Sequence, residues 1–552
     1  MSWLPLLACA ALLQTDAAQV EVAEDGAFVS TVFRVPKGVN LALSDMTGNG
    51  AQDLVWTDAD GLEVWTHESD RRLVREPVRR LTWPEGRVAW TLCDLDANGA
   101  FEVALLVEGK AVKVHTLGED GFDEGRIVLE STSLLPFGVS HMNFTRDVNG
   151  DGRTDLVLPG LGAHRIHLQQ DDGTFGAAIQ VRFDAEIEHL VGDMTSLDAT
   201  FGQTLTVPWF DMRDVDGDGS QDLVSTTRGR VAFHLARPTL TSDPTWTLDL
   251  DALREELPKR DGIDLDDLLS NVTQRVDWKI EDLDGKGHLD LIVMVGSRFR
   301  VYLNGSSSGP RETPDQVLRA SGNLLMTLVR QIEGDDLPEL QMVRGERIGI
   351  GRILRYLILP GQLDFDLFTY KNEGGTFSRK PTRRNKIALQ IPRLLALIDD
   401  DGIVAAVESQ FDIPALRVAS GDDQADHVMD MQDGSLVFFE NCAPPPSKEE
   451  ALMDGELTAE TFFEGWLLED LDKQGDGATK TIDLGDLSTF DFAPGAALRH
   501  TTLGKKPTYR VQLDPKHKHQ FAARHLNDDG KADVLLVSQT RSDWIVTWLV
   551  QR

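Results

Sequence analysis

One short pattern of polar and apolar residues recurs along the chain and predicts most of its structure. In each copy an acidic, glycine-rich segment is followed by a short aliphatic run, as in DLVL from Asp155, DLIVMV from Asp290 and DVLLV from Asp533. A turn and a second run of alternating apolar residues come next, as in FRVYLNG from Phe299. Short apolar runs bounded by Gly, Asp and Asn are typical of β-strands in hairpins. Each copy therefore predicts a small antiparallel sheet of three or four strands.

Eight copies can be aligned on the acidic residue that ends the glycine-rich segment: Asp53, Glu102, Asp155, Asp222, Asp290, Glu339, Asp426 and Asp533. Their spacing varies, which indicates insertions between otherwise similar units. A length of 552 residues alone favours roughly three or four domains, but a recurring unit favours one repeat domain instead. Small sheets stacked around an axis form a β-propeller, in which few strand edges are exposed.

We therefore predict an all-β fold, a β-propeller of seven or eight four-stranded blades, and the eight copies favour eight. The domain is expected to span residues 19–552, with insertions near 182–208, 248–276 and 443–480. Leucines at helical spacing in the second insertion and a capping box in the third predict helices there. These helices are expected either to dock on the blades or to cap one face of the ring.

The two ends of the chain predict how the ring closes. The last copy ends with the run DWIVTWLVQR from Asp543, after which the chain stops. Near the other end, AFVSTVFRVP (27–36) reads as a strand with no acidic loop of its own. We expect this N-terminal strand to complete the last blade as its outer edge and to close the ring.

The acidic segments of the third and fourth copies place side-chain oxygens at positions 1, 3, 5 and 9 of a nine-residue loop. The oxygen donors are Asp147, Asn149, Asp151 and Asp155 in the third loop, and Asp214, Asp216, Asp218 and Asp222 in the fourth. Gly152 and Gly219 occupy position 6, where a sharp turn lets the loop wrap around an ion. Hard oxygen ligands at alternating positions suit Ca²⁺ better than Mg²⁺ or a transition metal.

These loops, the strands that follow them and the Gly-Thr-Phe turns at 173–175 and 375–377 resemble the FG-GAP/VCBS repeats of the integrin α-subunit propeller. The resemblance extends over nearly all of the chain from about residue 28, apart from the insertions. It implies that the loops bind structural Ca²⁺ and join the first two strands of each blade.

By this resemblance, two to five loops hold Ca²⁺. The second loop offers Asp94, Asp96, Asn98 and Glu102. The first offers Asp45, Asn49 and Asp53 but has Thr47 at position 3, and the fifth offers Asp282, Asp284 and Asp290 but has Lys286 at position 5. The remaining copies have Gln331, Val418 and His525 at position 1 and are expected to keep the turn without metal.

Charge and cysteine content narrow the possible partners. The chain has 55 Lys and Arg against 90 Asp and Glu, a net charge of −35, which disfavours nucleic acid and anionic lipid as ligands. With 41 % hydrophobic and 26 % charged residues it is globular rather than disordered. Only Cys9, Cys93 and Cys442 occur, so the fold is no disulfide scaffold, and spacing leaves open whether Cys93 and Cys442 pair.

The N-terminus resembles a secretion signal. Residues 4–13 form an apolar run followed by Ala17 and Ala18, so residues 1–18 are predicted to be a signal peptide of a bacterial-type secreted, cell-surface or periplasmic protein. The alternatives are an apolar N-terminal strand or a lipid anchor at Cys9. No other stretch approaches the ~20 apolar residues of a membrane helix.

The sequence contains no recognised catalytic motif, such as GxSxG, HExxH, GxxxxGK[ST] or CxxC. A histidine cluster at 517, 519 and 525 reads as a solvated loop or, alternatively, as a metal site. Tryptophans at 56, 65, 83, 90 and 209 are expected in the core rather than on a sugar-binding surface. We predict a secreted, Ca²⁺-stabilised binding or adhesion module for an extracellular protein or glycan. The alternative is a lyase-like, polysaccharide-active enzyme, which rests on fold analogy alone.

Overall fold

The computed structural model describes residues 21–551, apart from 26–27, 37–39, 68–72, 184–185, 192–200, 238, 259–261, 333, 336, 392, 394–414, 419–426, 433, 440–467, 484–503, 515, 525, 528, 530 and 542. The predicted signal peptide, Cys9, Cys442, Asp426 and His525 therefore lie outside the described residues. Among the helices that are described, none is both long enough and apolar enough to cross a bilayer.

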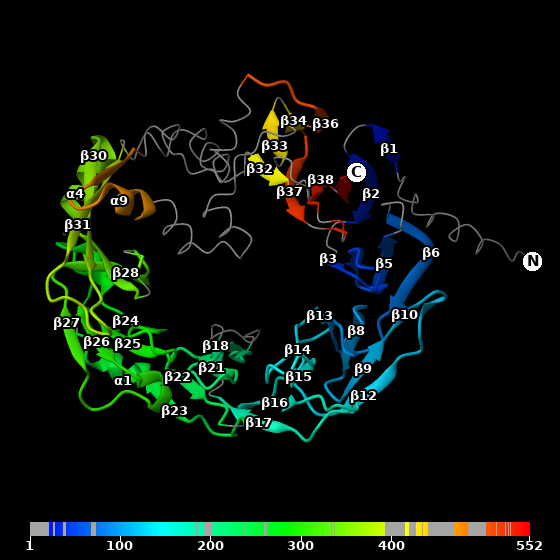
Figure 1. Cartoon of the computed structure of the whole chain (residues 1–552), viewed down its shortest axis with the longest axis horizontal. Helices are drawn as coiled ribbons and strands as arrows, with labels where there is room; N and C mark the ends of the chain where they lie inside the picture. The colour runs from blue at the N-terminus through cyan, green and yellow to red at the C-terminus, as the bar shows by residue number, and fades with distance from the viewer. Residues whose placement is uncertain are drawn as a thin grey trace, which may run out of the picture.

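Eight sheets of four or five strands follow one another along the described chain, and we number them 1 to 8. Figure 1 shows them placed in chain order around a common centre. Sheet 1 contains β3 (Asn40–Ser44), β4 (Asp53–Thr57), β5 (Gly61–His67) and β6 (Leu73–Thr82). Sheet 2 contains β7 (Val88–Cys93), β8 (Glu102–Val107), β9 (Ala111–His115) and β12 (Arg126–Glu130), with β13 (Val139–His141) parallel to β7. Sheet 3 contains β14 (Thr145–Arg146), β15 (Asp155–Leu158), β16 (Ala163–His167) and β17 (Ile179–Arg182), and sheet 4 contains β20 (Phe210–Arg213), β21 (Asp222–Thr226), β22 (Arg230–His234) and β23 (Trp246–Asp249).

Sheet 5 contains β24 (Val276–Glu281), β25 (Asp290–Val295), β26 (Arg298–Tyr302) and β27 (Gln316–Arg319), and sheet 6 contains β28 (Asn323–Arg330), β29 (Glu339–Gly345), β30 (Gly361–Tyr370), β31 (Arg383–Ile391) and β35 (Thr479–Asp483). Sheet 7 contains β32 (Ala415–Val418), β33 (His427–Gln432), β34 (Ser435–Phe439) and β36 (Tyr509–Gln512). Sheet 8 contains β37 (Lys518–Arg524), β38 (Asp533–Gln539) and β39 (Asp543–Gln551), together with β2 (Phe28–Pro36) and β1 (Glu21–Asp25) from near the N-terminus. Where the loop residues are described, the acidic loop joins the first two strands of its sheet. The all-β prediction and the antiparallel unit of each repeat are confirmed.

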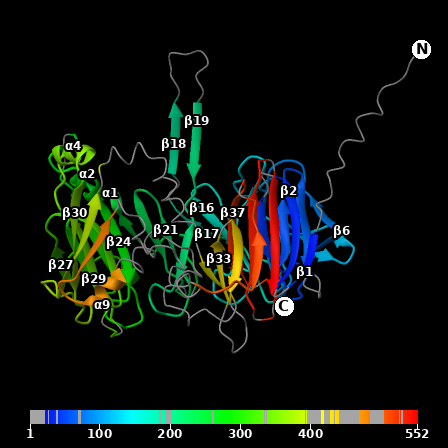
Figure 2. The same cartoon turned by 90° about the horizontal axis from the view of Figure 1, so that it is seen from above.

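The insertions adopt different structures. The hairpin of β18 (Glu186–Val191) and β19 (Phe201–Thr206) lies in the first predicted insertion and projects from one end of the molecule (Figure 2). The second insertion contains α1 (Leu250–Glu255) and α2 (Leu268–Thr273). Of the third, the structure describes α9 (Glu469–Gln474) and the start of β35. The sequence interpretation missed α3 (Gly305–Ser308), α4 (Ile350–Ile358) and the small hairpin of β10 (Leu117–Gly118) and β11 (Gly121–Phe122).

The third insertion connects two sheets. The chain leaves β34 of sheet 7, forms α9 and β35 on sheet 6, and returns to sheet 7 as β36. Leu468 and Leu471 are fully buried against Leu328, Val343, Leu367 and Ile387 of sheet 6. Docking on a blade, one of the two outcomes expected for this insertion, is therefore what its described part shows.

The core lies between neighbouring sheets. Within the described residues, separate clusters of buried apolar side chains join sheets 1 and 2, 2 and 3, 3 and 4, 4 and 5, 5 and 6, and 7 and 8. Trp56, Trp65, Trp83 and Trp90 are buried as predicted, whereas Trp209 is partly buried. A single β-sheet cannot cover its own two faces, so the apolar side chains of each sheet are buried by packing against the neighbouring sheets.

The N-terminal strand pairs with the last strand of the chain. β2 and β39 are antiparallel over nine residue pairs, from Phe28 with Gln551 to Pro36 with Asp543. Phe33 and Val35 from β2 and Trp548 from β39 pack against Trp65 of sheet 1 in one buried cluster. The predicted pairing is thus present, but β2 is not the outer edge, because β1 pairs with its other side.

A buried histidine links sheets 3 and 4. The His164 side chain is fully buried beside Phe183, Trp209 and Phe210, with ring centroids 4.5, 5.2 and 4.7 Å away. Its Nε2 lies 2.7 Å from the Pro208 carbonyl oxygen, which only accepts, so Nε2 carries the proton. Burial lowers the pKa of His164 to about 4, although the bond to Pro208 acts in the opposite direction.

Replacing Phe33 tests the dependence on the N-terminal strand. Phe33 is fully buried and meets Trp65 edge to face at 4.2 Å, so Phe33→Ala should lower the free energy of unfolding by roughly 3–5 kcal/mol in urea titrations. Deleting residues 1–36 should lower Tm more, whereas deleting residues 1–20 keeps β1 and β2 and should leave Tm unchanged. An unchanged Tm after the longer deletion would contradict this role.

His164 should make the fold sensitive to acid. Its folded-state pKa lies below the ordinary value of 6.5, so the unfolded chain binds the proton more readily and stability falls between pH 6.5 and 4. Full protonation should cost about 3 kcal/mol. His164→Phe should flatten this part of the stability–pH curve measured by chemical unfolding, and identical slopes for both proteins would count against it.

Candidate metal-binding loops

The acidic residue at position 9 is buried in the described repeats and ties the loop to two strands. Asp222 begins β21, is fully buried, and accepts hydrogen bonds from Val215 N at 2.9 Å and Ala236 N at 2.7 Å. The first donor lies in the loop, and the second is the second residue after the end of β22. One carboxylate therefore fixes the loop, the second strand and the end of the third.

The same arrangement recurs in other sheets. The paired backbone donors are Met46 and His67 for Asp53, Val148 and Gln169 for Asp155, and Leu283 and Asn304 for Asp290. Glu102 accepts from Leu95 N, Glu339 from Ile332 N and Asp533 from Leu526 N. Since Glu339 and Asp533 belong to copies that lack the metal pattern, this role does not depend on an ion.

Burial opposes the charge on these carboxylates. It raises the pKa of Asp53 to about 6, although hydrogen bonds from the backbone of His67 and Met46 lower it. Burial is likewise the largest cause of the raised pKa of Glu102, Asp155, Asp222 and Asp290.

The position-1 carboxylate shapes the loop from inside. Asp214 accepts hydrogen bonds from Gly217 N at 2.7 Å and Gly219 N at 2.9 Å, so the backbone curls around it. Gly219 has a φ of 86°, in the left-handed region that glycine adopts without strain, as predicted for position 6. Asp45, Asp147 and Asp282 accept from the glycines at the same two positions of their loops.

Three loops bring at least three metal-ligating side chains together. Their ligand atoms lie within 4.8 Å of one another in the groups Asp94, Asp96 and Glu102; Asp214, Asp216 and Asp218; and Asp282, Asp284 and His288. The predicted ligands of the second and fourth loops are therefore largely assembled. Asp222 and Asp290 are not members of these groups and instead hold the backbone.

Two carboxylate oxygens in these groups have no hydrogen-bond partner among the described residues: Asp216 Oδ1 and Asp284 Oδ1. Their side chains are only 7 % and 2 % exposed. A buried carboxylate oxygen without a donor is unfavourable, and a cation between the clustered carboxylates would satisfy it. The donor sets therefore fit a bound cation, and they consist mainly of the hard oxygens that Ca²⁺ prefers.

Basic side chains neutralise part of the charge in three loops. Arg237 Nε lies 2.5 Å from Asp216 Oδ2, Arg153 Nη2 lies 2.5 Å from Asp151 Oδ2, and Lys286 Nζ contacts Asp284 Oδ2. The charge of Lys286 was evident from the sequence. The sequence interpretation did not identify the contacts of three other basic residues with the loop acids. Two of these, Arg153 and His288, stand at position 7 of their loops and could have been noticed in the alignment, whereas Arg237 lies outside the loop.

The first and third loops are less well assembled. Asn49 donates its side-chain amide to His67 O at 3.1 Å and accepts from Ala51 N, so its side chain is used within the protein. In the third loop, Asn149 donates to Asp151 Oδ2 at 2.8 Å, and Arg153 contacts the same oxygen. A cation in the third loop would therefore have to displace the Arg153 guanidinium.

The C-terminal histidines do not converge in the part of the chain that is described. His519 contacts Ser538 Oγ at 2.7 Å and Asp514 O at 2.9 Å, while the rings of His517 and His519 are 6.3 Å apart. Cys93 is a free thiol, and burial raises its pKa to about 12, so it is unreactive.

No protein-family model matches this chain, and no curated protein matches it by sequence. Among solved structures, it is similar to an Agrocybe aegerita lectin that recognises non-reducing terminal N-acetylglucosamine (17 % identity, 62 % of this chain and 78 % of that one, TM-score 0.29). The V. cholerae biofilm matrix protein Bap1 (11 %, 59 % and 73 %, 0.24) and the Vanderwaltozyma polyspora Nup133 β-propeller domain (8 %, 96 % and 100 %, 0.26) are also similar. At these TM-scores the likeness carries no functional inference, and the description of the fold rests on its sheet topology.

Substitutions in the fourth loop should separate the structural carboxylate from the ion-facing ones. Without calcium, Asp222→Ala removes the acceptor of two buried N–H groups and should lower the free energy of unfolding by about 3 kcal/mol. Asp218→Ala changes an exposed side chain and should have little effect in the same urea titration. Equal losses in both variants would show that the two positions do not differ in role.

Proposed function

We propose that this protein is a Ca²⁺-stabilised β-propeller of the FG-GAP/VCBS type that acts as an extracellular binding or adhesion module. Two features support the architecture. The acidic loops connect the first two strands of successive sheets, and sheet 8 packs against sheet 1 through a shared apolar cluster. An eight-bladed ring completed by β2 accounts for both features, with the signal peptide at residues 1–18 directing secretion.

The observation that carries the calcium proposal is the buried, unpartnered Oδ1 of Asp216 within the group formed with Asp214 and Asp218. Asp214, Asp216 and Asp218 would hold Ca²⁺ in the fourth loop, and Asp94, Asp96 and Glu102 would hold it in the second. When bound, the ion supplies positive charge to a turn in which these carboxylates otherwise repel one another. Among the described residues, the predicted ligands of the first and third loops do not form a close group, and in the fifth Lys286 contacts Asp284. Arg237 likewise contacts Asp216 Oδ2 in the fourth loop, but that loop keeps three carboxylates close together and leaves Asp216 Oδ1 for a cation.

A binding role is supported by how the additional elements are placed. The β18–β19 hairpin, α2 and α4 lie toward the same end of the molecule (Figure 2). Segments that project from a rigid scaffold are where recognition is usually found. The ligand class proposed is an extracellular glycan or protein.

Calcium should raise the stability of the purified protein. At ten times the dissociation constant, each occupied loop should contribute about 1.4 kcal/mol by mass action. Metal is first removed with a chelator, and Tm is then measured by differential scanning calorimetry. We expect Tm to rise when CaCl₂ is added and to fall back to the metal-free value when the chelator is added again.

The double variant Asp214→Asn and Asp216→Asn should lose part of this shift, because it removes two charged ligands from one loop. The double variant Glu119→Gln and Asp120→Asn, which removes two charges from exposed acids outside the acidic loops, is the matched control. If calcium and chelator leave Tm unmoved, or if the control loses as much of the shift as the loop variant, calcium binding at these loops is refuted.

A further inference from the structure

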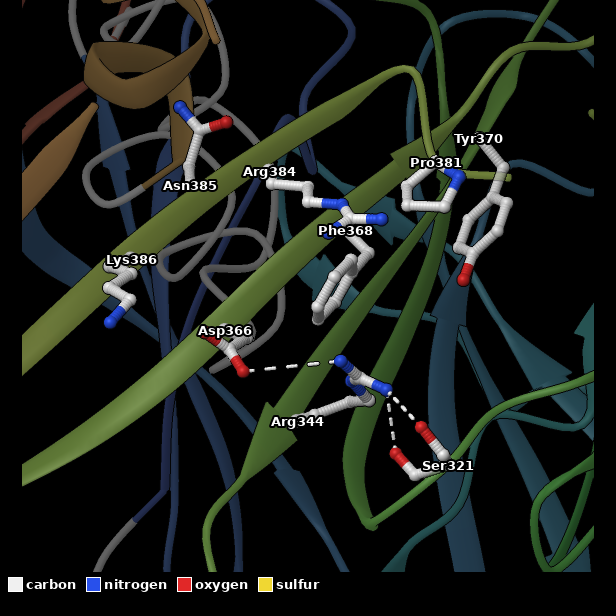
Figure 3. A pocket seen from close by; sticks show the side chains of 9 residues that line it. All are labelled: Ser321, Arg344, Asp366, Phe368, Tyr370, Pro381, Arg384, Asn385 and Lys386. Carbon is white, nitrogen blue, oxygen red and sulfur yellow. Dashed lines mark hydrogen bonds and ion pairs between the residues drawn. The ribbon is translucent and has the colours of Figure 1, made fainter. Parts of the chain in front are cut away.

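A cavity of about 520 Å³ lies on sheet 6, on the face turned toward sheet 5, and its lining is unusually basic for this chain (Figure 3). Arg344 from β29, Arg384 and Lys386 from β31, and Asp366, Phe368 and Tyr370 from β30 line it. We call these six residues the basic groove. Three cations and one carboxylate give the groove a net positive charge within a protein whose net charge is −35.

The strand register places these side chains on one face. Arg344 is opposite Asp366, which is opposite Lys386, while the next row in the same direction pairs Phe368 with Arg384. Since alternate residues of a strand point to the same side, the charged row and the aromatic row are neighbours. The groove is therefore a consequence of pairing among β29, β30 and β31.

Arg344 is held in place by contacts on several sides. Its guanidinium lies 3.7 Å from the centroid of the Phe368 ring, and Nη1 donates to the backbone oxygen and Oγ of Ser321, both at 2.7 Å. Its Nη2 is 3.9 Å from Asp366 Oδ2. Because Arg344 is already engaged, it forms the fixed wall of the groove rather than its free charge.

Arg384 and Lys386 provide the available charge. Neither forms an ion pair within 4.0 Å among the described residues, and both side chains are exposed. Arg384 lies 5.8 Å from the Phe368 ring centroid, so one side of its guanidinium faces an aromatic surface. An exposed arginine supported in this way is well suited to bind a carboxylate.

The strand that carries these two cations is anchored from its opposite face. Asn385 donates to Leu471 O at 3.2 Å and to Gly475 O at 2.7 Å, and Asp476 Oδ1 accepts from Arg384 N at 2.7 Å. Leu471 and its neighbours belong to the insertion that docks on sheet 6. The backbone that carries Arg384 and Lys386 is thereby fixed before a ligand arrives, which lowers part of the entropic cost of binding.

We infer that the basic groove binds an acidic saccharide, with one sugar carboxylate at Arg384 and another at Lys386, whose head groups point in different directions (Figure 3). Asp366, whose side chain is 47 % exposed, would accept hydrogen bonds from sugar hydroxyls, and Tyr370 would supply an apolar ring and a hydroxyl. A carboxylate beside the cations disfavours a bare phosphate or sulfate but suits a ligand that also carries hydroxyl donors. The cavity lies within the size range of small-ligand sites. This inference names the ligand of the proposed binding module and rests on that function.

The test is isothermal titration calorimetry of the calcium-loaded, full-length protein with defined oligosaccharides. The probes are tetrasaccharides of galacturonate, glucuronate and mannuronate, and the matched neutral probe of each is its methyl ester. We expect at least one uronate to bind, and its uncharged counterpart to bind at least about tenfold more weakly, because the ester removes the charge and keeps the hydroxyls.

Variants locate the site. Arg384→Gln and Lys386→Gln should each weaken uronate binding about tenfold without changing Tm, and Asp366→Ala should weaken it as well. Arg347→Gln removes an 88 % exposed cation that does not line the groove and should bind like the unmodified protein. Stronger uronate binding by Asp366→Ala would show that this carboxylate only repels the ligand.

Three results would overturn the inference: no uronate binds, sulfate or inorganic phosphate binds as tightly as the best uronate, or the Arg347 variant loses as much affinity as the groove variants. The calcium shift in Tm is measured on the same samples. A normal shift without uronate binding rejects only the basic groove, whereas loss of the calcium response rejects the proposed function itself.

Discussion

The fold depends on one buried interaction that is repeated along the chain: a carboxylate at the start of the second strand that binds backbone N–H groups of its own repeat. Asp222 joins Val215 and Ala236 in this way, and Asp53, Asp155 and Asp290 make the equivalent pairs. Removing such a carboxyl from water is unfavourable, which is why burial raises its pKa. Two charge-assisted hydrogen bonds offset that cost and leave the loop, second strand and third strand in a fixed arrangement.

This interaction divides the acidic residues of a loop into two kinds. The position-9 acid serves the fold, since it persists as Glu339 and Asp533 in copies whose loops lack the ligand pattern. The position-1 acid also accepts backbone N–H bonds within the loop, and in the fourth loop the ligand atoms of Asp214, Asp216 and Asp218 lie close enough together to hold a cation. In the fourth loop, both oxygens of Asp222 at position 9 already accept backbone hydrogen bonds, whereas Glu102 at the same position of the second loop lies within the group formed with Asp94 and Asp96.

The sequence predicts the local features well, because each is encoded within a few neighbouring residues. The strand after each loop, the left-handed glycine at position 6 and the N-terminal strand all follow from short patterns. What it cannot show are contacts between distant segments. The parallel pairing of β35 with β31 joins residues almost a hundred positions apart, and Arg237 reaches Asp216 from the end of the third strand. The sequence did not predict α4, because this helix lies between two strands of one repeat, where the repeat pattern predicts a turn. Several of its leucine and isoleucine residues are also exposed.

One of the repeats that lack an acid at position 1 while keeping the buried acid at position 9 is also the one with the basic groove. Its loop begins at Gln331 rather than at an acid, yet Glu339 still holds the turn through Ile332 N. The strands β30 and β31 of sheet 6 are ten and nine residues long, and the alternate residues of β29 and β31 place Arg344, Arg384 and Lys386 on one face. The insertion that returns from sheet 7 fixes β31 from behind. In the described repeats the common carboxylate holds the loop and the second strand whether or not the loop keeps the acids at positions 1, 3 and 5, so the other loop residues and the sheet surface can differ from one sheet to the next without loss of structure.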